Sequence, residues 1–248
     1  HHNLYYTEKI ASIFIAGLAT SKILILEGIS GTGKTSLPYV FGKFIKKDTS
    51  IISVQPSWRD RFEMMGYYNE FTKKFNETEF LTSLYDASFR TDVNLIVLDE
   101  MNLARVEYYF ADFLSLLELP NSDEWLIEIV PEQLIGDPIH LKSGKLKIPR
   151  NVWFIGTANN DDSTFGITDK VYDRASSIVM NEKAKPFKGQ PLDKINLSFE
   201  YLDGLFNDAY KSHEISHKNL VALEKLDEFI SETFQVTFGN RIMNQLHK

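Results

Sequence analysis

Residues 28–35 read GISGTGKT and match the pattern G-x-x-x-x-G-K-[ST]. This spacing suits phosphate groups, because the glycines let the loop turn its backbone N–H groups inward at the positive end of a helix. An apolar strand expected at Ile23–Leu26 precedes the loop, and a helix is expected to begin near Gly33. A glycine-rich turn without a ligand is the alternative, and the complete motif in this context disfavours it.

The parts of this loop have different expected roles. Lys34 would place its ammonium against the β- and γ-phosphates of a nucleotide, and the Thr35 hydroxyl would ligate Mg²⁺. Pro38 lacks an N–H group, which a helix tolerates near its first turn. The residues expected to bind the nucleotide are Gly28, Ile29, Ser30, Gly31, Thr32, Gly33, Lys34, Thr35 and Ser36.

Residues 95–100 read LIVLDE, an apolar strand that ends in two carboxylates. The carboxyl ends of strands in an open parallel sheet are where ligands bind. Asp99 is therefore expected to hold Mg²⁺, and Glu100 to orient and polarise an attacking water. An Asp-Glu pair that only caps the next helix is the alternative. P-loop kinases do not usually need this glutamate, and the guanine-reading N-K-x-D motif of small GTPases does not occur in this sequence.

Asn159 and three arginines are weaker candidates. Residues 152–159 read VWFIGTAN, so Asn159 ends another apolar strand, where its amide would reach a γ-phosphate or a lytic water. The turn-like residues after it favour a plain turn equally. Arg174 precedes the last expected strand, Arg241 opens the last expected helix, and Arg105 follows the carboxylates. From chemistry alone, surface ion pairs are the favoured reading of these arginines.

Composition limits the partners of the chain. The 248 residues carry a net charge of −7 and no cysteine, which fits a reducing cytoplasm and excludes disulfides. No apolar run has membrane-spanning length, so no membrane association is expected. Lys and Arg are scattered along the chain, whereas a domain that grips DNA usually has a basic face. Nucleic acid, if it is a target, is expected to be read by another domain or a partner.

The elements that must position these residues follow from the apolar pattern. Continuous apolar runs, rather than alternating ones, predict buried parallel strands and a three-layer α/β fold. The runs are Ile23–Leu26, Ile51–Val54, Leu95–Leu98, Trp153–Ile155 and Ser177–Met180, and the clearest helical pattern is Asn102–Glu118. Residues 3–184 are expected to form the core, with a hairpin or loop layer inserted at about 119–150.

The last quarter of the chain has a different pattern. Residues 185–197, around the stretch KAKPFKGQP, are expected to be a linker. Residues 198–248 predict a bundle of three amphipathic helices near 198–212, 217–234 and 239–248. The last of these stops without a capping glycine, so the chain is expected to be part of a longer protein.

The motifs occur in an order that resembles the AAA+ class and, within it, the McrB-like and dynein/MoxR-related branch. The resemblance spans nearly the whole chain and is carried by GISGTGKT, LIVLDEMNLARVEYYFADFLSLLE, IPRNVWFIGTANNDDSTFGITDKVYDRA and FGNRIMNQL. It implies a P-loop NTPase core with a parallel five-stranded sheet in the order 5-1-4-3-2 and a C-terminal helical lid. It also implies Mg-dependent nucleotide hydrolysis by a homo-oligomeric ring, expected to be a hexamer.

The resemblance assigns a role to each matching position. Gly28–Thr35 looks like Walker A, and Asp99-Glu100 like Walker B. Asn159 looks like sensor 1, Arg174 like an arginine finger that acts on the neighbouring subunit, and Arg241 like a sensor 2 residue in the lid. The catalytic set is therefore Glu100, Lys34, Asn159 and Arg174, with Thr35 and Asp99 as metal ligands and Arg241 added to the nucleotide-binding residues.

The sequence departs from McrB at one motif. McrB-like proteins carry M-N-T-A-D-R, and residues 158–163 here read ANNDDS, which keeps only the first Asn and the Asp. McrB prefers GTP and drives a nuclease partner. ATP is favoured here over GTP, because adenine is the commoner AAA+ ligand and no guanine-reading motif occurs. The leading hypothesis is the motor subunit of a McrB-like restriction or anti-phage system, and the alternatives are a MoxR-like chaperone or a slow nucleotide-gated scaffold.

Overall fold

A computed structural model gives the fold of the chain and describes residues 6–132, 136–161, 164–181, 193–235 and 237. The chain divides into two compact units, His1–Phe199 and Glu200–Lys248. No helix among the described residues is both long and apolar enough to cross a membrane.

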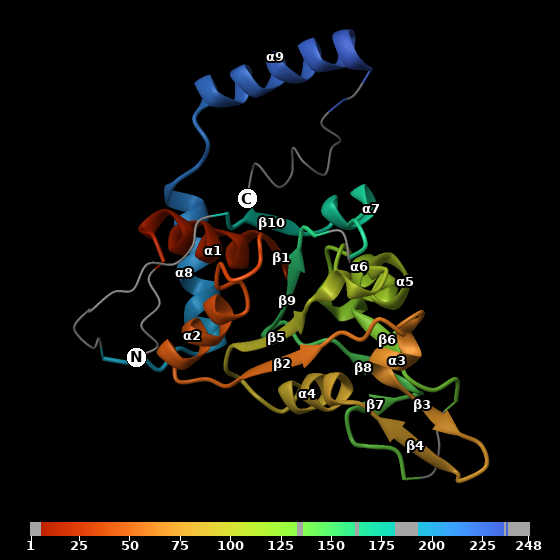
Figure 1. Ribbon diagram of the computed structural model, residues 1–248. Coiled ribbons are helices and arrows are strands. Elements are labelled where there is room, and N and C mark those ends of the chain that lie inside the picture. The colour runs from red at the N-terminus through yellow and green to blue at the C-terminus, as the bar shows by residue number, and fades with distance from the viewer. Residues whose placement is uncertain (1–5, 133–135, 162–163, 182–192, 236, 238–248) are drawn as a thin grey trace. The chain divides into compact units, whose positions relative to one another are not determined.

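The first unit is built on a five-stranded parallel sheet (Figure 1). Its strands are β1 (Ile23–Gly28), β2 (Thr49–Ser53), β5 (Asn94–Asp99), β9 (Val152–Asn159) and β10 (Ser176–Val179). Their order is β10-β1-β9-β5-β2, which is the predicted order 5-1-4-3-2. All six residues of β1 and the first seven of β9 are buried, as expected for central strands covered on both faces.

Helices cover both faces of the sheet and make the predicted three layers. On one face lie α1 (Glu8–Thr20) and α2 (Ser36–Phe44), which meet through Phe14 and Phe41 at 5.5 Å between ring centroids. On the other face lie α3 (Arg61–Met65), α4 (Glu79–Ala87), α5 (Val106–Tyr109) and α6 (Ala111–Leu116), whose buried residues join those of β5 and β9 in one hydrophobic core.

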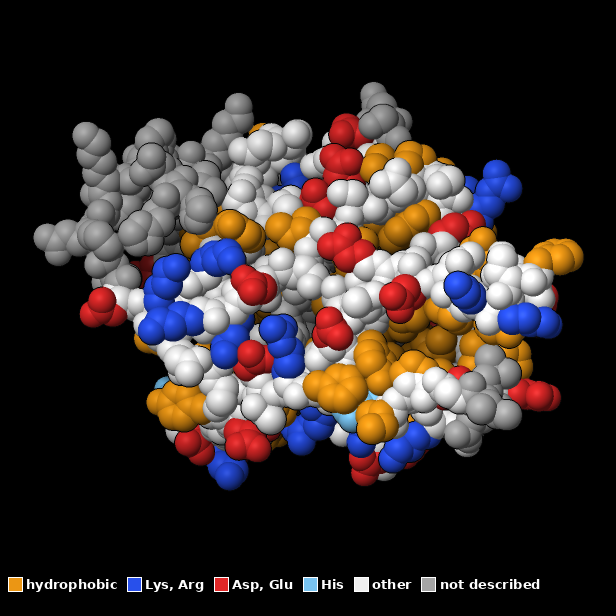
Figure 2. Space-filling model, turned by 90° about the horizontal axis from the view of Figure 1, so that it is seen from below, with side chains coloured by type: hydrophobic (Ala, Val, Ile, Leu, Met, Phe, Trp, Pro, Cys, Tyr) orange, Lys and Arg blue, Asp and Glu red, His pale blue; other side chains and the backbone are white. Residues whose placement is uncertain are grey.

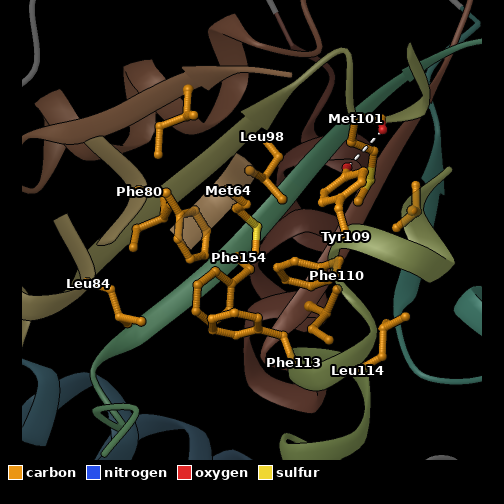
Figure 3. Close-up of a cluster of buried hydrophobic side chains, with 14 of the residues drawn as sticks. Met64, Phe80, Leu84, Leu98, Met101, Tyr109, Phe110, Phe113, Leu114 and Phe154 are labelled. Atoms are coloured by element: carbon orange, nitrogen blue, oxygen red, sulfur yellow. Dashed lines mark hydrogen bonds between the residues drawn. The ribbon is translucent and has the colours of Figure 1, made fainter. Parts of the chain in front are cut away.

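Aromatic rings fill this core. Phe154 of β9 packs against Phe113 at 5.1 Å and Phe110 at 5.6 Å between ring centroids, and Phe80 of α4 packs against Phe113 at 5.3 Å. Figure 3 shows these rings converging beneath the turn that follows β5. Buried aromatic pairs of this kind contribute about 0.5–1.5 kcal/mol each beyond their area. These rings therefore pack β9 against α4 and α6.

The helix predicted over Asn102–Glu118 is wrong as a single element. The structure has a 3₁₀ turn at Met101–Leu103, followed by α5 and α6. Ala104 is extended, with φ −126° and ψ 167°, and Phe110 breaks the helical path again at φ −108° and ψ 7°. The apolar spacing indicated which side of this segment faces the core. The backbone of its first turn is held by hydrogen bonds from Asn102 to Asn159 and Phe165, not by helix propensity.

Two small antiparallel sheets lie outside the main sheet. Between β2 and α4 the chain forms a hairpin of β3 (Gly66–Asn69) and β4 (Lys74–Glu77), which the sequence patterns did not predict. In the region 119–150, a 3₁₀ turn at Ser122–Glu124 precedes β6 (Leu126–Glu128), β7 (Leu141–Lys142) and β8 (Lys145–Lys147), which pair in the order β6-β8-β7.

The remaining helices are short or belong to the second unit. The helix α7 (Asp169–Tyr172) precedes β10. The chain then gives α8 (Phe199–Ser212), which begins at the boundary of the units, and α9 (His217–Phe234). Most of the expected linker 185–197 and all of the expected helix 239–248 lie outside the described residues.

Candidate functional site

The glycine-rich loop joins the carboxyl end of β1 to α2. Gly28, Gly31 and Gly33 have φ values of +143°, +79° and +87°, a region that glycine enters without strain. A Cβ at Gly28 would also lie 2.2 Å from the carbonyl oxygen of Met180. The regular helix begins at Ser36, not near Gly33 as predicted, because Pro38 has no N–H to donate to the carbonyl of residue 34.

Lys34 lies inside the loop with its side chain only 6% exposed. Its Nζ donates to the carbonyl oxygens of Gly28 at 3.0 Å and Ile29 at 2.9 Å. Burial lowers the pKa of the Lys34 ammonium below the ordinary lysine value, while nearby carboxylates, Asp99 first, act in the opposite direction. Phosphate oxygens would replace these carbonyls as stronger, charged acceptors.

The loop meets β5 through a short hydrogen bond. Thr35 Oγ1 donates to Asp99 Oδ1 at 2.6 Å, although 64 residues separate them in sequence. Mg²⁺ prefers hard oxygen ligands and is usually held by one or two protein side chains together with substrate phosphates. A hydroxyl and a carboxylate at this distance fit that chemistry. No cluster of three His, Cys, Asp or Glu side chains occurs in the part of the chain that the structure describes.

Glu100 and Asn159 face each other at the ends of β5 and β9. Asn159 Nδ2 donates to Glu100 Oε1 at 3.4 Å. The Glu100 side chain is exposed, and its backbone is left-handed, with φ 54° and ψ 47°. Thr35 is bonded to Asp99, Asn159 is bonded to Glu100, and the two carboxylates are adjacent in sequence. The structure therefore brings these four predicted residues together at one edge of the sheet.

Three further residues that the motifs did not single out support this site. The buried Asn102 donates through Nδ2 to the carbonyls of Asn159 at 2.9 Å and Phe165 at 3.1 Å. Thr157 bonds to both residues of the carboxylate pair. Tyr6 donates through its hydroxyl to the Gly33 carbonyl at 2.9 Å, and burial raises the pKa of that phenol to about 12. Only Thr157 had a sequence signal, since it lies two residues before Asn159 and so on the same strand face.

Arg174 lies apart from these contacts, between α7 and β10. Its Nε is 3.0 Å from Oε2 of Glu118, two residues after the end of α6, without the alignment of a hydrogen bond. The preceding helix is tied to β1, because the Tyr172 hydroxyl donates to the buried Glu27 carboxylate at 2.8 Å. Burial and this bond raise the pKa of Tyr172.

The other two arginines contribute less. Arg105 is exposed, and its guanidinium carbon lies 5.2 Å from the Phe165 ring centroid. Arg241 lies outside the described residues.

Comparisons with known proteins bear on the fold. No protein-family model matches the sequence, and no curated protein matches it. Among solved structures, the chain is similar to a protein from Cytophaga hutchinsonii described as a "putative ATPase", with a TM-score of 0.55 and 16% identity. That likeness covers 92% of this chain and 66% of the other, so the chain spans just under two thirds of that relative.

A second solved structure is similar over a smaller part. It is a mutant of RuvB from Thermotoga maritima, with a TM-score of 0.39, 12% identity, and coverage of 71% of this chain and 45% of the other. The overlap with RuvB is too partial to carry an argument. The first likeness, together with the strand order, supports the predicted three-layer α/β fold with a five-stranded parallel sheet.

Proposed function

We propose that this chain is a Mg-dependent nucleoside triphosphatase of the AAA+ type. The observation that carries the proposal is the hydrogen bond of 2.6 Å between Thr35 and Asp99. It brings the phosphate loop and the carboxylate pair to one sheet edge, where phosphoryl transfer needs both. Because little covalent chemistry falls to the protein in this reaction, positioning and charge neutralisation are the main requirements.

Each residue then has a defined task in hydrolysis. Lys34 holds the β- and γ-phosphates, and the N–H groups of the loop bind their remaining oxygens. Thr35 and Asp99 would hold Mg²⁺, which would neutralise phosphate charge when bound. Glu100 orients the attacking water and draws its proton away, and the Asn159 amide fixes the water or the γ-phosphate opposite it.

We further propose that the chain works in a homo-oligomeric ring, a hexamer, in the cytoplasm. Its target would be engaged through a partner subunit, a nuclease in a McrB-like restriction system. The charge distribution supports a partner as the reader of nucleic acid. On the face that Figure 2 draws, Lys and Arg side chains stand among Asp and Glu and do not form one basic patch. A MoxR-like chaperone or a slow scaffold would share the same nucleotide site.

The test is phosphate release from ATP and from GTP by the purified chain with and without Mg²⁺. Lys34→Ala should abolish nucleotide binding or nearly all turnover, because the loop loses its buried cation. Lys43→Ala is the matched control, since Lys43 lies on the following helix and forms its ion pair with Asp48, at 2.8 Å, outside the loop. Near-normal hydrolysis by Lys34→Ala would exclude the proposed function.

A competition experiment on the same purified chain tests whether it prefers ATP or GTP. ATP and GTP compete against a fluorescent nucleotide for the site, and we expect ATP to bind more tightly. A preference for GTP above about tenfold, which corresponds to roughly 1.4 kcal/mol, would reverse this expectation and favour the McrB-like role.

A further inference from the structure

Thr157 lies at the centre of the candidate site, although the sequence motifs assign it no role. It is a residue of β9 whose side chain is only 2% exposed. Its hydroxyl accepts a hydrogen bond from the backbone N–H of Glu100 at 2.9 Å and donates one to Asp99 Oδ1 at 2.8 Å. One hydroxyl on the neighbouring strand therefore bonds to both members of the carboxylate pair.

The bond to Glu100 lies where the pairing of the strands ends. The ladder between β5 and β9 runs as far as Leu98 opposite Gly156. Beyond it, Glu100 turns into the left-handed region at φ 54°, which is uncommon for a residue with a side chain and has to be held by its surroundings. The Thr157 hydroxyl accepts a hydrogen bond from the backbone N–H of Glu100, beyond the last paired residues of β5 and β9. It thereby fixes the turn that directs the Glu100 side chain toward Asn159.

The bond to Asp99 fixes the second carboxylate. Asp99 Oδ1 accepts from two hydroxyls, Thr35 at 2.6 Å and Thr157 at 2.8 Å. In the proposed site, Thr35 would turn its hydroxyl oxygen to the cation and give up its hydrogen bond to Asp99. The hydrogen bond from Thr157 to Asp99 would remain. Groups that orient a metal-binding carboxylate in this way set metal affinity although they do not touch the metal.

We propose that Thr157 is a positioning residue, which sets the orientation of Asp99 and the backbone turn at Glu100. Through the first it governs the use of Mg²⁺, and through the second it governs the turnover rate. This inference rests on the proposed function, because it assigns Thr157 to the same reaction. A threonine that only stabilised the strand would affect folding without a specific effect on Mg²⁺.

The experiment compares Thr157→Val, which removes the hydroxyl at nearly constant shape, with Thr157→Ser, which keeps it. Thr78→Val is the matched control. The Thr78 hydroxyl also accepts one backbone N–H, from Leu81 at 3.2 Å, and donates to one oxygen, the Met64 carbonyl. It does so at the start of α4, and no hydrogen bond joins it to the residues of the nucleotide site described above.

Thr157→Val should bind nucleotide without Mg²⁺ as the unmodified chain does. Its turnover should fall by about 10- to 100-fold, with a higher Mg²⁺ concentration for half-maximal rate. Thr157→Ser should restore turnover to within a few-fold of normal. Thr78→Val should lower the thermal midpoint and leave the Mg²⁺ dependence unchanged.

Two results would overturn the inference. One is normal turnover and normal Mg²⁺ dependence in Thr157→Val, and the other is a change that Thr78→Val reproduces in full. If the unmodified chain binds Mg-nucleotide but does not hydrolyse it, the proposed function fails while the inference stays testable. The tightening of nucleotide binding by Mg²⁺ then decides it, because Thr157→Val must lose that tightening if Thr157 positions Asp99.

Discussion

The carboxylate pair shows how differently two adjacent acids are placed. Asp99 still belongs to β5 and accepts hydrogen bonds from two hydroxyls, so its charge is satisfied inside the protein. Glu100 has left the strand, is exposed, and meets only the amide of Asn159 at 3.4 Å among the hydrogen bonds described for its side chain. A base needs such freedom, because a carboxylate already saturated with donors would hold a water proton poorly.

Glu100→Gln should separate binding from hydrolysis. The glutamine keeps an oxygen that accepts from Asn159 but lacks the basicity to draw a proton from water. We expect Mg-nucleotide to remain bound while turnover falls by about 10²- to 10⁴-fold. Bound nucleotide and single-turnover phosphate release measure the two effects on the same sample.

Glu70→Gln serves as the control for this substitution. Glu70 is exposed and pairs with Lys73 in the turn between β3 and β4. If Glu100→Gln lost nucleotide binding as well as turnover, Glu100 would be holding the fold of the site instead of acting on water.

The sequence predicts the site only as far as strand ends can be located. The phosphate loop and the carboxylates each follow an apolar run, and parallel strands bring their carboxyl ends to one edge, so their proximity is predictable. Thr157 is different. Its position two residues before Asn159 indicates the strand face, but its role depends on the register that sets Leu98 opposite Gly156. That register is fixed by the packing of residues far apart in sequence, which no local pattern records.

At the scale of elements, β9 and the turn after β5 fit together closely. A Cβ built on Gly156 would lie 1.8 Å from Met101 Sδ, so the glycine leaves the space in which the Met101 side chain lies. Met101 is itself fixed, because its carbonyl accepts the buried hydroxyl of Tyr109 at 2.8 Å (Figure 3). Burial raises the pKa of that phenol well above its ordinary value.

Gly156→Ala should therefore destabilise the chain by about 1–3 kcal/mol, the usual cost of overpacking. The thermal midpoint of unfolding measures this cost. The double variant Gly156→Ala, Met101→Ala should be destabilised by less than the sum of the two single variants. The shortened side chain at position 101 frees the space that the alanine at position 156 takes. Additive costs would mean that the backbone of β9 shifts away from Met101, so that the length of the Met101 side chain does not matter.

The fold of the elements was predictable wherever burial alone decides it. The five apolar runs predicted the strands of the central sheet, and the resemblance supplied their order. Burial on both faces was predicted correctly for β1, β5 and β9 but not for the edge strands β2 and β10, which are only partly buried. The segment 102–118 shows the limit, because its apolar residues are spaced as in a helix while its first turn is held by bonds to the segment after β9. The β3–β4 hairpin was missed because its polar residues lack the alternation that marks a half-buried strand.

At the scale of the whole molecule, Arg174 raises the question of assembly. Within its own subunit it lies against Glu118, and both side chains are about a quarter exposed or less. An arginine that acts across an interface would have to exchange this partner for a phosphate of the neighbouring subunit. Head-to-tail contacts between subunits close into a ring when the rotation from one subunit to the next closes.

Arg174→Ala should bind nucleotide normally and hydrolyse it on the order of 10³-fold more slowly, if the guanidinium stabilises the transition state of a neighbour. Mixing this variant with Lys34→Ala should restore part of the activity, because some interfaces then pair an intact loop with an intact arginine. Steady-state turnover of the mixture is compared with each variant alone, at a concentration where oligomers are shown to form.

The opposite outcome is equally informative. If subunits demonstrably exchange and the mixture is as inactive as its components, Arg174 does not act in trans. Arg105, and Arg150, which lies two residues before β9, then become the candidates for the same test. Glu118→Gln supplies an independent check, because loosening the partner of Arg174 should leave the activity intact or raise it.

The position of β9 in the sheet determines when the site can form during synthesis of the chain. The strands that carry the phosphate loop and the carboxylates, β1 and β5, are not paired with each other; each pairs with β9, which lies between them. A ribosome releases β1 and β5 first, and the strand that must separate them follows more than fifty residues later. Such long-range parallel pairing is slow to form. The nascent chain therefore carries a phosphate loop and a carboxylate pair that cannot yet meet, and we expect the proposed Mg-nucleotide site to form only after residue 159 has left the exit tunnel.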